Sequence, residues 1–344
     1  MQDFPSRLIN WQKLHGRHDL PWQNTRDPYA IWVSEIMLQQ TQVAAVIGYY
    51  QRFMQRFPTI ASLANAEQEQ VMQYWSGLGY YSRARNLHSA AQIIMDEHAG
   101  IFPDDFDKIM SLPGIGRSTA AAITSFCFDT PKAILDGNVK RVFARHFLVE
   151  GWPGLPKVEK QLWQLAEELL PKADMVAYTQ GLMDLGATLC TRSKPRCEAC
   201  PLQLSCKAFQ CNRTKDLPTS KPRKAIPDKY TTMLVLKQFD EVLLEKRPPS
   251  GIWGGLWSLP EITEAEDARQ IASQRFGVET AVLPALPTFT HTFTHFRLHI
   301  TPQPLQVTKH LPVAQESGLI WLSREDAIGA ALPTPIRKLL LNLD

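Results

Sequence analysis

Apolar residues recur at intervals of three and four over the first 210 residues of the chain, as in the series Ile31, Leu38 and Val46. This spacing places apolar side chains on one face of a helix, and strand-like alternation is scarce in the same stretch. Pairs such as Asp27-Pro28 and Phe102-Pro103 interrupt the pattern and divide it into separate helices. The pattern therefore predicts an all-α domain over residues 1–211.

The pattern changes after Cys211. Residues 212–229 carry three prolines and six basic residues against two acidic ones. This composition is typical of a solvated linker, although contact with phosphate is equally compatible with it. Beyond the linker, residues 230–344 predict a smaller α+β domain. Its expected strands are 231–237, 241–247, 293–300 and 318–322, with a turn at Phe239-Asp240, and its expected helices are 264–276 and 334–343.

Length and composition agree with two domains. The chain has 344 residues, 44% of them hydrophobic, and a net charge of +3, which leans only slightly toward a polyanionic partner. We find no signal peptide and no apolar run long enough to span a membrane. A cytoplasmic monomer with no membrane association is therefore the expectation.

Leu112-Pro113-Gly114-Ile115-Gly116 follows one helical segment and opens another. Glycines at 114 and 116 allow a tight turn whose N–H groups point outward at a helix start, where they attract phosphate. An ordinary interhelical turn would have the same residues. Asp136 follows twenty residues later, and the combination resembles the helix-hairpin-helix, Gly/Pro-rich, Asp glycosylase superfamily. The resemblance implies that Gly114 and Gly116 grip the DNA backbone and that Asp136 is catalytic, while an N-cap role for Asp136 is the alternative.

Five of the six cysteines lie between residues 190 and 211. In a reducing compartment such a group indicates a metal rather than disulfides. The spacing of Cys190, Cys197, Cys200 and Cys206 suits four thiolate ligands to zinc or to an iron–sulfur cluster, and spacing alone does not decide between them. The pattern resembles the iron–sulfur loop of the endonuclease III and MutY glycosylases, which implies a [4Fe–4S] cluster on residues 190–206. Cys211 is expected to be a bystander.

Glu35 lies in the segment WVSEIMLQQT, which Asp27-Pro28 predicts to be helical. Ile31 and Leu38 share its helical face, and a carboxyl among apolar neighbours has a raised pKa. A surface glutamate on an amphipathic helix is the alternative. The segment resembles, residue for residue, the catalytic segment of the MutY-type adenine DNA glycosylases, which implies that Glu35 is a general acid.

The same resemblance assigns further residues. Bifunctional relatives carry a lysine two residues after the second hairpin glycine, whereas this chain has Ser118, and a hydroxyl cannot form an imine. The resemblance therefore implies a monofunctional enzyme in which Ser118 and Asn138 support Glu35 and Asp136. It also implies a duplex DNA partner carrying adenine opposite 8-oxoguanine or guanine, with the adenine flipped out of the helix.

Several positions resemble the DNA-contacting and base-lining residues of the family. Gln40, Leu78 and Tyr80 resemble its intercalating wedge, although Leu78 could instead belong to the core. Arg83 and Arg85 could bind phosphate or simply lie on a solvated helix face. Trp22 and Gln180 are candidates for lining the adenine pocket.

The stretch RPPSGIWGGLWSLPE resembles the start of a Nudix domain, with Gly255 followed by Glu261. The glutamates that bind magnesium in an active Nudix box are missing, which predicts a Nudix-like fold without hydrolase activity or nucleotide cofactor. Phe293-Thr294-His295 resembles the family's Phe-Ser-His segment, which implies recognition of the oxidised guanine. A zinc site at His291 and His295 is the rival interpretation of the same segment.

Three other functions remain open at this point. A bifunctional lyase for oxidised pyrimidines is opposed by Ser118 and by the second domain. An inert, cluster-containing scaffold that binds DNA would leave Glu35 without a role. A nucleotide pyrophosphatase would require the missing magnesium ligands.

Overall fold

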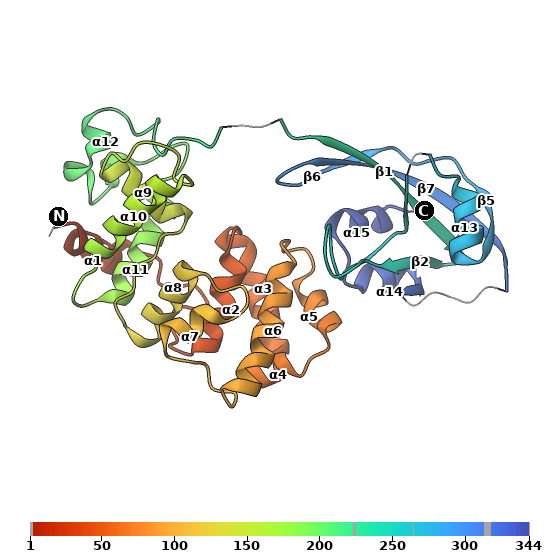
Figure 1. Ribbon diagram of the computed structural model, residues 1–344, viewed down its shortest axis with the longest axis horizontal. Helices are drawn as coiled ribbons and strands as arrows, with labels where there is room; N and C mark the ends of the chain where they lie inside the picture. The colour runs from red at the N-terminus through yellow and green to blue at the C-terminus, as the bar shows by residue number, and fades with distance from the viewer. Residues whose placement is uncertain (1–2, 223–224, 264, 313–317, 344) are drawn as a thin grey trace. The chain divides into compact units, whose positions relative to one another are not determined.

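The computed structural model describes residues 3–222, 225–263, 265–312 and 318–343. These residues form two compact units (Figure 1). The first unit takes in the described residues of 1–65 and 86–223, and the second takes in those of 66–85 and 224–344. The grouping of residues 66–85 with the C-terminal part is not visible in the hydrophobic pattern. Two residues of the predicted linker, 223 and 224, and residue 264 of a predicted helix lie outside the described residues.

The first unit is helical, as the spacing of apolar residues predicts. Its helices are α1 (Asp3–His15), α2 (Pro28–Leu38), α3 (Val43–Arg56), α4 (Ile60–Ala64), most of α6 (Ser82–Glu97), α7 (Phe106–Ser111), α8 (Arg117–Phe128), α9 (Gly137–His146), α10 (Pro156–Glu168), α11 (Met175–Asp184) and α12 (Lys207–Gln210). A π-helical segment, η1 (Leu185–Leu189), continues directly from α11, and two short 3-10 turns, η2 (Cys197–Ala199) and η3 (Gln203–Ser205), follow. No described helix has the length and apolar character needed to cross a membrane.

Local chemistry sets the starts of the helices that carry the site. Asp27 caps α2 by accepting a hydrogen bond from the Tyr29 N–H, and Pro28 occupies the first helical position. The turn between α7 and α8 contains Gly114 at φ +81°, where a Cβ would lie 2.9 Å from Cβ of Asn86. Only glycine fits this position, because both the backbone conformation and the close neighbour exclude a side chain.

An apolar core lies beneath α1, α8, α9, α10 and α11. Leu8, Phe143 and Leu162 are fully buried within it, and Val139 packs there from the first turn of α9. The first turn of α9 is therefore anchored in the core, and the residue that caps the helix, Asp136, is held in place by this packing.

The second unit contains a mixed sheet with the main order β3-β2-β1-β7-β5. The strands are β1 (Asp228–Gln238), β2 (Glu241–Lys246), β3 (Trp257–Ser258), β4 (Glu261–Ile262), β5 (Val278–Val282), β6 (Phe289–Thr292), β7 (Arg297–His310) and β8 (Leu319–Ser323). Strands β1 and β7 pair in parallel and the other pairs are antiparallel. The helices of this unit are α5 (Gln68–Trp75), α13 (Ala268–Phe276), α14 (Arg324–Gly329) and α15 (Thr334–Leu341).

One predicted strand is wrong over its first half. Residues 293–300 alternate in polarity, yet the structure has a turn at 293–296 between β6 and β7. The Phe293 N–H donates to the Phe296 carbonyl at 2.9 Å, and the two rings stack with centroids 4.6 Å apart. Alternation alone cannot separate these cases, because Phe296, Leu298 and Ile300 keep the period of a strand although β7 begins only at Arg297.

Candidate active site

A cavity of about 470 Å³ opens in the helical unit beside α2 and α11. Glu35 lies on its wall, as do Trp22 and Gln180. Its further lining comes from the segment between α1 and α2 and from α11, which places residues distant in sequence around one space. The cavity has the size of a pocket for a small planar ligand, and polar and charged side chains form much of its wall.

Glu35 sits among buried residues of α2, with Ser34 and Ile36 both almost inaccessible. Burial raises the pKa of Glu35 from 4.5 to about 8, and the negative charge of Asp136 raises it further in the same direction. The carboxyl therefore holds its proton at neutral pH. A protonated carboxylic acid facing a cavity can act as a general acid.

Asp136 has the N-cap role that was the alternative interpretation of its position. Its Oδ1 accepts the Val139 N–H at 2.8 Å and thereby caps α9. Burial raises the pKa of Asp136, while hydrogen bonds from the backbone of Val139 and Asn138 and the charge of Arg141 oppose the rise. Asp136 does not line the cavity itself, yet its charge acts on Glu35. The two carboxyls therefore interact electrostatically, although only Glu35 lines the cavity.

A chain of hydrogen bonds leads from Asp136 toward the cysteine loop. Asn138 Nδ2 donates to Asp136 Oδ2 at 3.5 Å, and Arg141 Nη2 donates to Asn138 Oδ1 at 2.7 Å. The same guanidinium donates to the carbonyls of Gly186 and Cys190, each at 2.7 Å. Gly186, in the π-helical segment, packs so closely that a Cβ there would lie 2.5 Å from Cβ of Asn138. Arg141 and Gly186 were not singled out by the sequence, because their roles depend on contacts 45 to 49 residues away.

Ser118 has a structural partner. Its Oγ accepts the Leu135 N–H at 3.0 Å, which ties the first turn of α8 to the residue preceding Asp136. The hydroxyl therefore orients the Asp136 segment. Its position in the fold is compatible with the supporting role expected of it.

The residues expected to contact DNA differ in exposure. Gly114 and Gly116 are exposed on either side of the buried Ile115, so the backbone of the turn faces solvent. Gln40 is exposed and has φ +57°, and Tyr80 is 45% exposed with φ +48°. Leu78 is only 8% exposed, which matches the alternative of a core residue.

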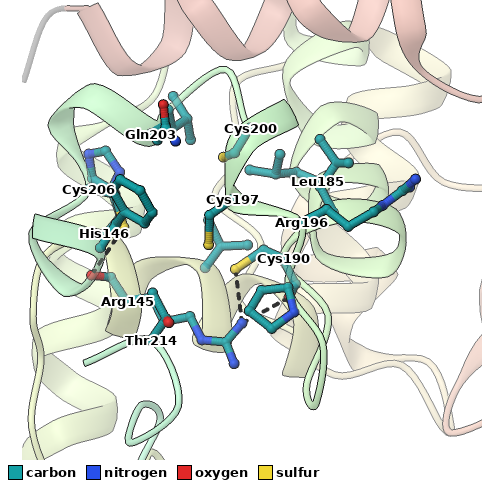
Figure 2. A pocket seen from close by; sticks show the side chains of 15 residues that line it. Arg145, His146, Leu185, Cys190, Arg196, Cys197, Cys200, Gln203, Cys206 and Thr214 are labelled. Carbon is teal, nitrogen blue, oxygen red and sulfur yellow. Dashed lines mark hydrogen bonds between the residues drawn. The ribbon is translucent and has the colours of Figure 1, made fainter. Parts of the chain in front are cut away.

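Four cysteines surround one pocket of the helical unit. The side chains of Cys190, Cys197, Cys200 and Cys206 line it together (Figure 2). Arg145, which is 2% exposed, donates from Nη1 to Cys190 Sγ at 3.3 Å and to the Thr191 carbonyl. Its Nε and Nη2 donate to the Leu217 and Arg192 carbonyls. Among the described residues, no group of three or more His, Cys, Asp or Glu side chains is arranged to hold a single metal ion. Cys211 is exposed and does not line the pocket.

A second cavity, of about 650 Å³, belongs to the second unit. Phe293, Thr294 and His295 line it from the turn between β6 and β7, and Tyr80 lines it as well. Trp253 and His291 contact the Phe293 ring, with centroids 5.6 and 4.6 Å away. The three residues expected to recognise a lesion therefore share one aromatic cavity.

Glu261, the glutamate expected from the Nudix pattern, is paired with Arg247 at 2.6 Å. Arg269 and Gln270, in register with the magnesium-binding set, lie on α13 without an accompanying glutamate cluster among the described residues. The Glu261 carboxylate therefore forms an ion pair within the fold.

A buried polar group that the sequence did not reveal lies beside the first cavity. Asp184, at the end of α11, is 0% exposed and binds Arg17 and Gln180. The four-residue spacing of Gln180 and Asp184 on one helix is the only signal that could have indicated their contact. Arg17 lies far away in sequence, so its pairing with Asp184 depends on the packing of α1 against α11.

Comparisons with known proteins agree with this arrangement. Residues 33–168 match the model of the HhH-GPD superfamily of base excision DNA repair proteins, and residues 231–342 match that of the NUDIX domain. The chain is 37% identical over 341 residues to the adenine DNA glycosylase of Buchnera aphidicola subsp. Acyrthosiphon pisum, covering 98% of this chain and 97% of that one. It is 34% identical over 398 residues to the adenine DNA glycosylase of Homo sapiens, covering 97% and 73%.

Solved structures resemble the helical part of the chain. A thermostable thymine-DNA glycosylase superposes with a TM-score of 0.56 at 30% identity, covering 61% of this chain and 96% of that one. An endonuclease III in a non-covalent complex with DNA superposes with a TM-score of 0.52 at 23% identity, covering 61% and 97%. The second likeness concerns the fold alone.

Proposed function

The chain belongs to the family of adenine DNA glycosylases, and from this premise we propose that it hydrolyses the N-glycosidic bond of adenine opposite 8-oxoguanine or guanine in duplex DNA. The observation that carries the proposal is the protonated Glu35 on the wall of a cavity suited to a base, coupled to Asp136. A base inside a duplex cannot reach such a group, so the adenine must be flipped out of the helix.

Glu35 supplies the proton that the reaction requires. Adenine is a poor leaving group until one of its ring nitrogens is protonated, and a carboxyl with a pKa of about 8 is protonated at neutral pH. When the glycosidic bond breaks, the bond electrons leave with the protonated adenine and Glu35 is left as a carboxylate. That carboxylate then accepts a proton from the water that attacks the sugar carbon.

Asp136 stabilises the positive charge that develops on the sugar. The division of labour between an acid and a charge-stabilising carboxylate parallels glycoside hydrolysis. Asn138 holds the carboxylate by a hydrogen bond, and Arg141 holds Asn138. Ser118, which binds the Leu135 N–H, has no amine with which to form a Schiff base. The enzyme is therefore monofunctional, with water as the nucleophile.

The exposed turn at Gly114 and Gly116 binds the phosphate backbone through its N–H groups, as helix starts do. Gln40 and Tyr80 are each exposed, and each contacts DNA as the family's wedge residues do, whereas Leu78 is largely buried. Phe293, Thr294 and His295 read the opposite base in the aromatic cavity of the second unit. Thr294 is exposed and offers its hydroxyl to that base.

We infer that the four-cysteine pocket would hold a [4Fe–4S] cluster through Cys190, Cys197, Cys200 and Cys206. The donor set fits, because four thiol side chains line one pocket. When bound, the cluster supplies cross-links between the ends of the loop and a redox-active centre. Arg145 positions Cys190 by its hydrogen bond to the sulfur, and Arg141 joins the Cys190 carbonyl to the Asn138 side chain.

The first test is single-turnover cleavage of a duplex with adenine opposite 8-oxoguanine, followed by alkali to reveal abasic sites. We expect the wild type to release adenine and Glu35→Gln to release none. Borohydride should trap no covalent complex. A trapped complex would show a lyase, and release by neither protein with DNA binding intact would leave only a scaffold function.

Specificity is tested on the same duplex with guanine, thymine or cytosine opposite adenine. We expect excision opposite 8-oxoguanine and guanine only. Thr294→Ala should reduce the rate opposite 8-oxoguanine more than the rate opposite guanine, since a hydroxyl contact to the lesion is lost. Equal losses would remove Thr294 from lesion recognition.

A further inference from the structure

Arg85, in the first turn of α6, is half-buried and belongs to the second unit. Its Nη1 donates to the carbonyl of Gly254 at 2.6 Å, across 169 residues of sequence. Gly254 is buried, and a buried carbonyl needs a donor, which a guanidinium supplies with a strong hydrogen bond. The sequence allows Arg85 to bind phosphate or to lie on a solvated helix face. In the structure its side chain instead binds a carbonyl within the fold.

The carbonyl that Arg85 binds belongs to a tightly folded loop, residues 248–255. A Cβ at Gly254 would lie 2.7 Å from the carbonyl oxygen of Pro249, so the loop folds back on itself at this point. Trp253 has φ +54°, in the left-handed region that residues with a side chain rarely adopt. Such a conformation persists only where the surrounding contacts hold it. The hydrogen bond from Arg85 to the adjacent Gly254 is one of these contacts.

Trp253 connects this loop to the cavity of the second unit. It is 7% exposed and lines the cavity of about 650 Å³ together with the turn that carries Thr294. Its ring contacts those of Phe293 and His291, with centroids 5.6 and 5.7 Å away. Packed rings restrict one another, so a displaced Trp253 would release Phe293 and change the shape of the cavity wall.

We propose that Arg85 is a positioning residue for the second cavity, because it holds the 248–255 loop in the conformation that keeps Trp253 against the Phe293 ring. The inference rests on the proposed recognition of 8-oxoguanine in this cavity. It adds to that function a residue from α6, far in sequence from the strands and turn that form most of the cavity. Loss of the Arg85 hydrogen bond should therefore weaken the binding of a duplex with 8-oxoguanine more than that of a duplex with guanine.

The experiment measures the affinity of the full chain for two duplexes, with adenine opposite 8-oxoguanine and opposite guanine, by fluorescence anisotropy. All proteins carry Glu35→Gln, so that adenine stays in place during the titration. The variants are Arg85→Met, Arg85→Lys, Trp253→Leu and the double variant of Arg85→Met and Trp253→Leu. The measured quantity is the ratio of the two dissociation constants, in which differences in folded fraction cancel. Arg275→Met is the matched control, because Arg275 pairs with Glu245 in the same unit and does not line the cavity.

We expect Arg85→Met to reduce the preference for 8-oxoguanine by about tenfold, the scale of one charged hydrogen bond. Arg85→Lys can still donate one hydrogen bond to the Gly254 carbonyl and should recover part of the preference. The double variant should lose no more than Trp253→Leu, because Arg85 acts through the loop that carries Trp253. Arg275→Met should keep the preference of the parent protein.

A second measurement requires no DNA. Chymotrypsin cleaves after accessible aromatic residues, and Trp253 is buried in the folded loop. The fragments are identified by mass. We expect cleavage after Trp253 to be several-fold faster in Arg85→Met than in the parent protein, because the loop opens more often when one of its contacts is lost. Arg275→Met should be cleaved at the rate of the parent protein.

Equal weakening of both duplexes by Arg85→Met, with a smaller dependence of affinity on salt, would overturn the inference and make Arg85 a phosphate ligand. An unchanged preference in Arg85→Met would overturn it as well. If Arg85→Met does not fold, Trp253→Leu decides, since an unchanged preference in that variant excludes the loop from recognition. Equal binding of both duplexes by the parent protein is a different result, because it removes the proposed lesion recognition before any variant at Arg85 is measured.

Discussion

Arg141 donates from Nη2 to Oδ1 of Asn138 at 2.7 Å, while its Nε binds the carbonyl of Cys190. One side chain therefore joins the amide beside Asp136 to the first residue of the four-cysteine pocket. The guanidinium is suited to this role because its donors lie in a fixed plane and can serve several acceptors at once.

Replacing Arg141 should affect the chemical step more than DNA binding. In Arg141→Met, Asn138 loses its partner and Asp136 loses both an oriented amide and a nearby positive charge. We expect the single-turnover rate to fall by about 10- to 100-fold, the scale of a lost charge-assisted hydrogen bond. DNA affinity, measured by fluorescence anisotropy, should change by less than the rate does. Arg7→Met, at a half-buried residue that pairs with Asp3, provides the control.

The rate of excision should depend on pH through Glu35. The acid form is required, and burial raises the pKa of Glu35 to about 8. The single-turnover rate should therefore fall as pH rises through that value. The measurement is a pH profile of the rate with enzyme in excess. A profile that breaks near pH 4.5 instead would show that Glu35 titrates as an ordinary surface carboxyl.

The same raised pKa makes a prediction about stability. Between about pH 4.5 and 8 the folded state holds a proton on Glu35 that the unfolded state releases. The contribution of Glu35 to the free energy of unfolding therefore falls as pH rises over this range. Glu35→Gln removes this cost and should increase the free energy of unfolding at pH 8 by on the order of 4 kcal/mol. The two proteins should be equally stable near pH 4, as measured by denaturant titration. Equal stability at both pH values would contradict the burial of the carboxyl.

Gly186 should not tolerate a methyl group. A Cβ at this position would lie 2.5 Å from Cβ of Asn138, and the neighbour belongs to the first turn of α9. Gly186→Ala should lower the free energy of unfolding by about 1–3 kcal/mol and displace Asn138 from Asp136. Gly329→Ala is the matched control, because a Cβ at Gly329 meets nothing within 4 Å. Thermal melts and single-turnover rates of both variants give the comparison.

The cysteines should divide into two groups when the protein is purified and its iron is measured. Cys200→Ser removes a side chain that lines the four-cysteine pocket, and we expect loss of iron and of the visible absorption of a cluster. Cys211→Ser removes an exposed thiol outside the pocket and should retain both. Zinc in place of iron in the wild type, by elemental analysis, would contradict the cluster.

Much of the helical unit could be predicted from the sequence, because the signals that mark its helices lie close together along the chain. The period of apolar residues indicated helices, Asp27-Pro28 marked the start of α2, and the two glycines marked the turn before α8. Residues 293–296 could not be predicted in the same way. Whether alternating residues form a strand or a turn depends on the pairing of β6 with β7, which is not local.

The sequence by itself determined the kinds of groups present: a carboxyl among apolar neighbours, a second one at a helix start and four clustered thiols. Only the tertiary structure decided their protonation and partners. The pKa of Glu35 rises because folding removes water and brings Asp136 near, and Asp184 becomes a fixed acceptor because α1 and α11 pack together. Electrostatic energies depend on distance and burial in space, and these do not follow from position along the chain.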